Sequence, residues 1–199
     1  MLTYVTGNHG KYLSVKKTFA KEGVEVDFYD YDFAEPEVND ITLISKAKAL
    51  NAYNMLQTEV FVTDAGFYIE NYPNNPGYPG AFVKRSGIAN DIPKLLSEMK
   101  DVKDRHAYFM DCTTYYDGKE FHTFYGKSPG TITYEQHGLD KDAQWSKLWH
   151  VFIPDGYDIT LSEMTDEQRQ NRNELHTSGT KEFLKWYKEH KNVKKLSKK

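Results

Sequence analysis

The chain has 199 residues, with 26 basic and 29 acidic side chains that give a formal net charge of -3 at pH 7. This nearly balanced charge provides no general attraction to nucleic acid or to anionic membranes. The lone Cys112 excludes an internal disulfide, and no N-terminal apolar stretch is long enough for a signal peptide or a membrane span. We therefore expect a cytoplasmic protein with neither nucleic-acid nor membrane partners.

Patterns typical of strands alternate with patterns typical of helices through the first half of the chain. Apolar residues 1–5 predict a strand, helical spacing over 11–22 predicts a helix, and alternation over 24–28 predicts a second strand. Asp40 is a suitable N-cap for a helix that extends to about residue 57, and residues 60–62 predict a third, buried strand. This order predicts an α/β domain whose helices pack on a sheet.

The second half of the chain adds elements that predict antiparallel pairing. A helix is expected over residues 88–99, and residues 107–116 and 121–125 flank a glycine-containing turn as in a β-hairpin. A polar, helix-prone stretch over 163–187 is expected to be divided near Gly179. The predicted fold class is therefore α/β, with an elongated mixed sheet flanked by helices.

The length of the chain suits one sizeable core or two closely joined lobes. We expect a single domain over residues 1–190, because no internal repeat and no linker-like stretch interrupts them. A lysine-rich tail over residues 191–199 follows, and we expect it to be solvated and frayed.

The most informative segment is the turn over residues 6–11, which reads Thr6-Gly7-Asn8-His9-Gly10-Lys11. It connects the first strand to the first helix, and the start of a helix presents unpaired N–H groups at the positive end of its dipole. Such a turn suits a phosphate group, to which Lys11 adds a mobile charge and Asn8 a neutral amide. An ordinary strand-to-helix turn with a solvated lysine is the alternative interpretation.

Further polar groups lie at the ends of the other predicted strands. Glu35-Pro36-Glu37 follows the second strand, Thr63-Asp64-Ala65-Gly66 follows the third, and Lys46 and Lys48 lie on the helix between them. Carboxylates at neighbouring strand ends, facing a phosphate-binding turn, are what a hard divalent cation and a nucleoside triphosphate require. Each carboxylate taken alone is more typical of a surface or capping residue.

A series of short motifs extends from residue 3 to about residue 187. In chain order they are Thr6-Gly7-Asn8 with Lys11, Pro36-Glu37 ahead of Lys48, Asp64 with Gly66, residues 79–84, residues 126–132, residues 152–157 with Thr160, and Glu163-Met164. Together they resemble the inosine triphosphate pyrophosphatase family, which converts non-standard purine nucleoside triphosphates to the monophosphate and pyrophosphate.

The resemblance implies a sheet split into two lobes, an active site in the cleft between them, and usually a homodimer. It implies that Asp64 is the general base that activates water, that Glu37 holds Mg²⁺ with Asp64, and that Lys48 and Lys11 grip phosphate oxygens. The turn of Thr6, Gly7 and Asn8 completes the phosphate site. For the base, Trp149, Lys84 and Arg169 are the candidate contacts.

The sequence departs from the family pattern where the base should be recognised. The family's Gly-aromatic-Asp-Pro run is replaced by residues 145–151, which include Trp145, Trp149 and His150, and its Ser-His-Arg falls by spacing on residues 173–175. A shifted register brings Arg172 or His176 there instead. Purine discrimination rests on such side chains, so specificity for inosine or xanthosine is left open.

Two departures affect the catalytic end. Thr63 and Ser14 stand where the family often has acidic residues, so metal binding relies on Glu37 with Asp64 or recruits Glu35. The leading hypothesis is an Mg²⁺-dependent pyrophosphatase for a non-standard purine (deoxy)nucleoside triphosphate. One alternative is a nucleotide-binding module without turnover, and another is a pyrophosphatase for a modified or pyrimidine nucleotide.

Overall fold

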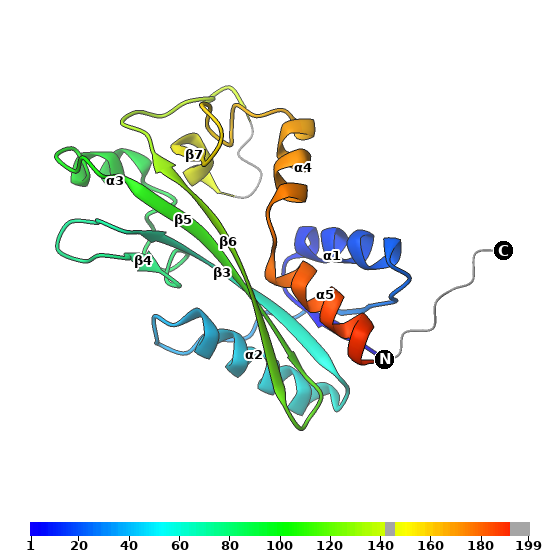
Figure 1. The fold of residues 1–199 in the computed structure, drawn as a ribbon. Helices are drawn as coiled ribbons and strands as arrows, with labels where there is room; N and C mark the ends of the chain where they lie inside the picture. The colour runs from blue at the N-terminus through cyan, green and yellow to red at the C-terminus, as the bar shows by residue number, and fades with distance from the viewer. Residues whose placement is uncertain (142–145, 192–199) are drawn as a thin grey trace. The chain divides into compact units, whose positions relative to one another are not determined.

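The computed structural model describes residues 1–141 and 146–191, without the side chains of Glu174 and Leu175. Trp145 and the tail over residues 192–199 therefore lie outside the described residues. The elements, shown in Figure 1, are β1 (Thr3–Val5), α1 (His9–Lys21), β2 (Asp27–Tyr29), α2 (Ile41–Leu56), β3 (Val60–Ile69), β4 (Pro79–Gly80), α3 (Ile92–Glu98), β5 (His106–Tyr116), β6 (Phe121–Ile132), the 3-10 helix η1 (Lys147–His150), β7 (Phe152–Pro154), α4 (Asp166–Leu175) and α5 (Gly179–His190).

The strands form one seven-stranded sheet in the order β2-β1-β3-β5-β6-β7, with β4 paired to β3. β1 runs parallel to β2 and to β3, whereas β3 with β4 and β6 with β7 are antiparallel. The sheet is therefore mixed, and the predicted α/β class is confirmed. Among the described residues, no helix combines the length and apolar composition needed to cross a membrane.

The Cα positions divide the chain into two compact units. Among the described residues, the first unit comprises residues 1–64, 111–126 and 178–191, and the second comprises residues 65–110, 127–141 and 146–177. The long strands β3, β5 and β6 contribute residues to both units. Each unit is described by itself below, and the single domain expected over residues 1–190 stays a prediction.

The first unit has an apolar core on each face of its part of the sheet. Phe19 of α1 and Phe183 of α5 pack with Phe61 and Tyr115 on one face. On the other face, Ala49 and Ala52 of α2 pack against residues 60 and 62 of β3. Figure 1 shows the same arrangement, with α1 and α5 on one side of these strands and α2 on the other.

One expectation about the third strand is wrong. Residues 60–62 were expected to be a short strand that ends before Thr63-Asp64-Ala65-Gly66, but β3 continues without interruption from Val60 to Ile69. Gly66 allows β4 to lie close to this strand, because a Cβ at that position would lie 2.9 Å from the carbonyl oxygen of Gly80 on β4. Asp64 therefore projects from the middle of a strand, which holds its backbone more firmly than a turn does.

In the second unit, a buried arginine connects the end of α3 to the end of β6. Arg105 is only 3% exposed, and its guanidinium donates hydrogen bonds to the carbonyl oxygens of Met99 at 2.5 Å, Ile132 at 2.9 Å and Thr133 at 2.8 Å. These carbonyls belong to the end of α3 and the end of β6. Since a guanidinium presents its donors in a fixed planar fork, no other side chain reproduces all three bonds.

We therefore expect Arg105→Lys to lower the free energy of unfolding by about 2–4 kcal/mol, because at least one buried carbonyl loses its partner. The measurement is urea unfolding followed by circular dichroism. Lys103→Met, which alters an exposed neighbour, is the control and should change the free energy by no more than about 0.5 kcal/mol. Equal effects of the two substitutions would contradict the role given to Arg105.

Candidate active site

The predicted phosphate turn lies at the start of α1, in the first unit. β1 ends at Val5, and Asn8 is the N-cap of α1, where its Oδ1 accepts the N–H of Lys11 at 2.9 Å. The N–H of Asn8 in turn donates to Oγ1 of Thr6 at 3.1 Å. The turn is therefore fixed by its own side chains, with the remaining first-turn N–H groups at the positive end of the helix.

Gly7 is required at this turn because the loop after β2 passes close to it. A Cβ on Gly7 would lie 2.9 Å from the Cβ of Asp32, which is closer than side-chain atoms tolerate. The glycine thus lets the loop that leads to Glu35 lie against the phosphate turn. Local sequence explains the turn, while the approach of residue 32 is visible only in the structure.

Helix α2 positions the central lysine of the site. Oδ1 of Asp40 caps this helix by accepting the N–H groups of Thr42 at 2.8 Å and Leu43 at 3.1 Å, as the sequence predicted. On the face toward the sheet, Ser45 donates to Thr114 of β5 at 2.8 Å, and Ala49 and Ala52 are fully buried. Lys48 belongs to this same buried face, which directs it at β3.

The Lys48 ammonium forms two ion pairs at once. Its Nζ lies 2.7 Å from Oε1 of Glu35 and 2.8 Å from Oδ1 of Asp64. Lys48 is 8% exposed, and the side chains of Asp64 and Glu35 are 12% and 21% exposed. We call these three residues the ion cluster. It joins the loop after β2, helix α2 and strand β3.

Burial and charge act in opposite directions on the ion cluster. Burial alone lowers the pKa of Lys48, but the Asp64 carboxylate, followed by Glu35, raises it overall. For Asp64, burial raises the pKa above its ordinary value, while the Lys48 and Lys11 ammonium groups oppose this rise. Asp64 is thus a better proton acceptor than an exposed aspartate, and Lys48 remains charged.

Lys11 lies in the electrostatic field of the same cluster. Burial lowers its pKa, the nearby Lys48 lowers it further, and the carboxylates of Asp64, Asp111 and Asp32 oppose this. Asp111 was not singled out from the sequence, where one acidic residue in an otherwise mixed strand gives no signal. Its Oδ2 accepts the N–H of Gly179 at 2.7 Å, at the start of α5.

Thr63, which stands where the family often has an acid, is bonded to a buried tyrosine. Its Oγ1 lies 2.5 Å from the hydroxyl of Tyr4, and Tyr4 is fully buried with its ring stacked on Phe61. Burial raises the pKa of Tyr4 to about 12, against the effect of hydrogen bonds to Thr63 and Thr6. A neutral hydroxyl contact therefore ties the phosphate turn to the residue before Asp64.

The two candidate carboxylates around Pro36 differ in the structure. Glu35 contacts Lys48, whereas the side chain of Glu37 is exposed and, within residues 1–141 and 146–191, forms no hydrogen bond or ion pair. The structure thus brings Glu35, Lys48 and Asp64 together and leaves Glu37 in solvent. The assignment of Glu37 as a metal ligand stays a prediction.

The donor set of the ion cluster fits a hard divalent cation. Over the described ranges, no three His, Cys, Asp or Glu side chains form a ready-made metal-binding group. However, Oδ2 of Asp64 is buried and, among the described residues, has no hydrogen-bond partner. Burying a carboxylate oxygen without a hydrogen-bond partner costs free energy unless a ligand takes the place of that partner. Mg²⁺ prefers oxygen ligands of this kind.

The candidate base-binding residues all lie in the second unit. The Arg169 guanidinium lies 5.6 Å from the centre of the Trp149 ring, and its Nη1 donates to the carbonyl oxygens of Leu161 at 3.1 Å and Met164 at 2.7 Å. Lys84 is exposed. His150 is buried and hydrogen-bonded through Nδ1 to the carbonyl oxygen of His137 at 2.9 Å, a structural role. The structure therefore brings together Trp149 and Arg169.

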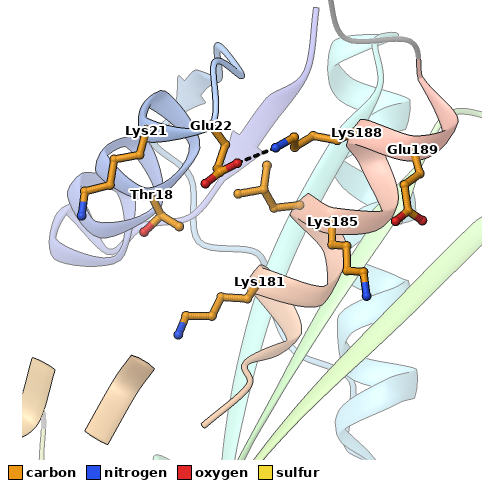
Figure 2. Close-up of a pocket in the computed structure, with 8 residues that line it drawn as sticks. Thr18, Lys21, Glu22, Lys181, Lys185, Lys188 and Glu189 are labelled. Atoms are coloured by element: carbon orange, nitrogen blue, oxygen red, sulfur yellow. Dashed lines mark hydrogen bonds and ion pairs between the residues drawn. The ribbon is translucent and has the colours of Figure 1, made fainter. Parts of the chain in front are cut away.

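A separate pocket lies between α1 and α5 in the first unit. Figure 2 shows Lys21 and Glu22 on one side and Lys181, Lys185 and Lys188 on the other, with Glu22 and Lys188 joined as an ion pair. Its volume is about 440 Å³. Because it lies by the C-terminal end of α1, opposite to the end that carries the phosphate turn, it is not the predicted active site.

The fold and the ion cluster define an α/β protein with a capped helix N-terminus after its first strand and a buried lysine–carboxylate group. The sequence model of the Ham1 family matches residues 2–186. The chain therefore belongs to the Ham1 family, and the family resemblance seen in the sequence motifs is confirmed.

Curated relatives cover nearly the whole chain. A "dITP/XTP pyrophosphatase" of Thermococcus kodakarensis is 33% identical over 190 residues, which cover 94% of this chain and 97% of the relative. One of Saccharolobus solfataricus with the same name is 30% identical, over 93% of this chain and 94% of the relative.

Solved structures agree in fold. A Ham1 protein of Staphylococcus aureus has a TM-score of 0.75 at 20% identity, covering 95% of this chain and 99% of its own. A HAM1 protein of Coxiella burnetii has a TM-score of 0.79 at 18% identity, covering 95% of this chain and 100% of its own. At these identities the likeness shows a shared fold.

The ion cluster gives a direct prediction about Asp64. Lys48→Met removes a cation that stabilises the ionised carboxylate, so the pKa of Asp64 should rise further above its ordinary value. The measurement is an NMR titration of the Asp64 side-chain carbon. Lys46→Met, two residues away on α2, is the matched control and should leave the titration unchanged. A pKa that stays the same or falls in Lys48→Met would argue against the ion pair.

Proposed function

We propose that this chain is an Mg²⁺-dependent pyrophosphatase that hydrolyses a non-standard purine (deoxy)nucleoside triphosphate to the monophosphate and pyrophosphate. The observation that carries the proposal is the ion cluster beside the phosphate turn. The enzyme class expected from the sequence, a nucleoside triphosphate pyrophosphatase, is confirmed by the curated relatives. The metal, the preferred base and the residue roles below are parts of the proposal.

Asp64 is the proposed general base. It takes a proton from the water that attacks a phosphorus atom of the triphosphate, and the attacked phosphorus loses pyrophosphate as the leaving group. The raised pKa of Asp64 suits this role, because a base is more effective when its pKa lies nearer to the working pH. Its position within β3 fixes the direction from which it accepts the proton.

Lys48, Lys11 and the turn of Thr6, Gly7 and Asn8 are the proposed phosphate-binding groups. A triphosphate carries several negative charges close together, and its hydrolysis is helped mainly by holding it in place and by balancing those charges. The start of α1 offers N–H groups, and the two lysines add charge. Lys48 therefore serves both the phosphate and the proposed base.

Glu37 and Asp64 are the residues that would hold Mg²⁺. The exposed Glu37 and the unpaired Oδ2 of Asp64 support this choice. When bound, the ion would supply positive charge to the phosphate oxygens and lower the pKa of water near it. Glu35 already neutralises Lys48, so its part is to hold that lysine.

Base recognition is assigned to the second unit, with Trp149 as a stacking surface and Arg169 and Lys84 as polar contacts. The Arg169–Trp149 contact supports the first two of these. The relatives' names include dITP and XTP, which are purine nucleotides with an oxygen at position 6 of the base, and we propose a substrate of this class. A homodimer in the cytoplasm completes the proposal.

Nucleotide binding without turnover is the second candidate. Thr63 supports it, because a neutral Tyr4–Thr63 contact stands at a position where the family often has an acid. Hydrolysis of a modified or pyrimidine nucleotide is the third hypothesis. All three are separated by one panel of triphosphates that includes inosine, xanthosine, modified purine, pyrimidine and ordinary bases.

We expect the wild-type protein to release pyrophosphate from a purine triphosphate of this panel, and Asp64→Asn to lower kcat by about 10²–10⁴-fold, the usual contribution of a general base. The measurement is pyrophosphate release with Mg²⁺, together with near-UV circular dichroism to verify the fold. Saturable nucleotide binding with no pyrophosphate from any triphosphate would favour the binding module. Activity of Asp64→Asn equal to wild type would remove Asp64 from the mechanism.

The metal assignment has its own test. Glu37→Gln should raise the Mg²⁺ concentration required for half-maximal rate by about tenfold, because one negative oxygen ligand is lost. Lys46→Met, which leaves the carboxylates intact, is the control and should keep the wild-type requirement. An unchanged requirement in Glu37→Gln would show that Glu37 is not a ligand.

A further inference from the structure

The ion cluster contains one ammonium group and two carboxylates in direct contact. At 2.7 Å and 2.8 Å, the contacts of Lys48 with Glu35 and Asp64 leave no room for an intervening water molecule. The lysine is nearly buried, so solvent provides little alternative solvation for its charge. Lys48 thus already contacts Asp64, the carboxylate that the proposed function also assigns to a metal ion.

A divalent cation and a lysine ammonium have the same kind of partner in this cluster. Hard divalent cations take carboxylate oxygens as ligands, and each cation close to Lys48 would be repelled by it. Because the cluster is largely removed from water, this repulsion is screened less than at an exposed site. Lys48 and a divalent cation therefore repel each other when both lie close to the Asp64 carboxylate.

We propose that Lys48 and a divalent cation compete for the carboxylate of Asp64, so that Lys48 releases Asp64 before the cation binds there. This inference rests on the proposed function, since the triphosphate gives Lys48 another anionic partner. Metal binding and triphosphate binding are then linked, because the phosphate oxygens hold the lysine that the metal displaces.

The structure also shows how a cation could bind Asp64 without competing with Lys48. Lys48 contacts Oδ1 of Asp64, whereas Oδ2 is buried without a partner among the described residues. A cation on Oδ2 with Lys48 still on Oδ1 needs no release of the lysine. In that arrangement Lys48 would affect the cation only through its charge, as Lys11 acts on Asp64 through its charge.

The test measures Mn²⁺ binding to the full chain without nucleotide, by electron paramagnetic resonance of the unbound ion. We expect Lys48→Met to bind Mn²⁺ at least about tenfold more tightly than wild type, because the competing cation is gone. Lys48→Arg, which keeps the charge and its hydrogen bonds, should restore weak binding. If Lys48→Met does not fold, as judged by circular dichroism, Lys48→Gln takes its place.

Two further variants separate competition from a general charge effect. Lys11→Met removes a charge that also acts on Asp64 but makes no direct contact with it in the ion pairs above, and it should tighten Mn²⁺ binding by no more than about threefold. Lys46→Met should match the wild type. Tightening in Lys48→Met no greater than in Lys11→Met would overturn the competition and favour the Oδ2 arrangement.

The outcome is independent of turnover. Equal Mn²⁺ affinities of wild type and Lys48→Met overturn this inference and leave pyrophosphate release untouched. Absence of pyrophosphate release from every triphosphate overturns the proposed function, while the Mn²⁺ measurement still reports whether Lys48 excludes a cation from Asp64.

Discussion

The geometry of the candidate site depends on the burial of one positive charge. Lys48 is buried with Glu35 and Asp64 in direct contact with its ammonium, and these contacts offset part of the cost of removing the three charges from water. The apolar contact of α2 with β3 through Ala49 and Ala52 fixes where the charge sits. Packing thus determines the geometry of the site, and electrostatics determines which side chains can occupy it.

Much of the first unit follows from local sequence signals. The capping residue Asp40 begins α2 where the sequence predicted, because a cap needs only its own side chain and the next few N–H groups. The length of β3 was not predictable in the same way. Thr63-Asp64-Ala65-Gly66 has the composition of a turn, and only its pairing and the close approach of β4 at Gly66 make it a strand.

The choice between Glu35 and Glu37 shows a second limit of sequence reasoning. Both residues flank Pro36 in a loop, and a loop has no helical or strand periodicity from which to predict which side chain points toward α2. The family resemblance implies that Glu37 belongs to the active site, whereas in the structure it is Glu35 that contacts Lys48. The two statements agree if the residues have different tasks, one holding the lysine and the other facing solvent and the substrate's metal. Asp111 was missed for a similar reason, since its role depends on the distant Gly179.

The phosphate end and the base end of a nucleoside triphosphate are recognised by different kinds of side chains. Phosphate groups are the same in every nucleoside triphosphate, so under the proposed function one charged cluster serves any of them. A base is distinguished by neutral hydrogen bonds, and these change with single substitutions in loops and helix ends. The chain keeps motif residues at the phosphate end, whereas Trp149 and Arg169 form a contact in the second unit amid altered neighbours. Under the proposed function, a change of preferred base is therefore compatible with an unchanged phosphate chemistry.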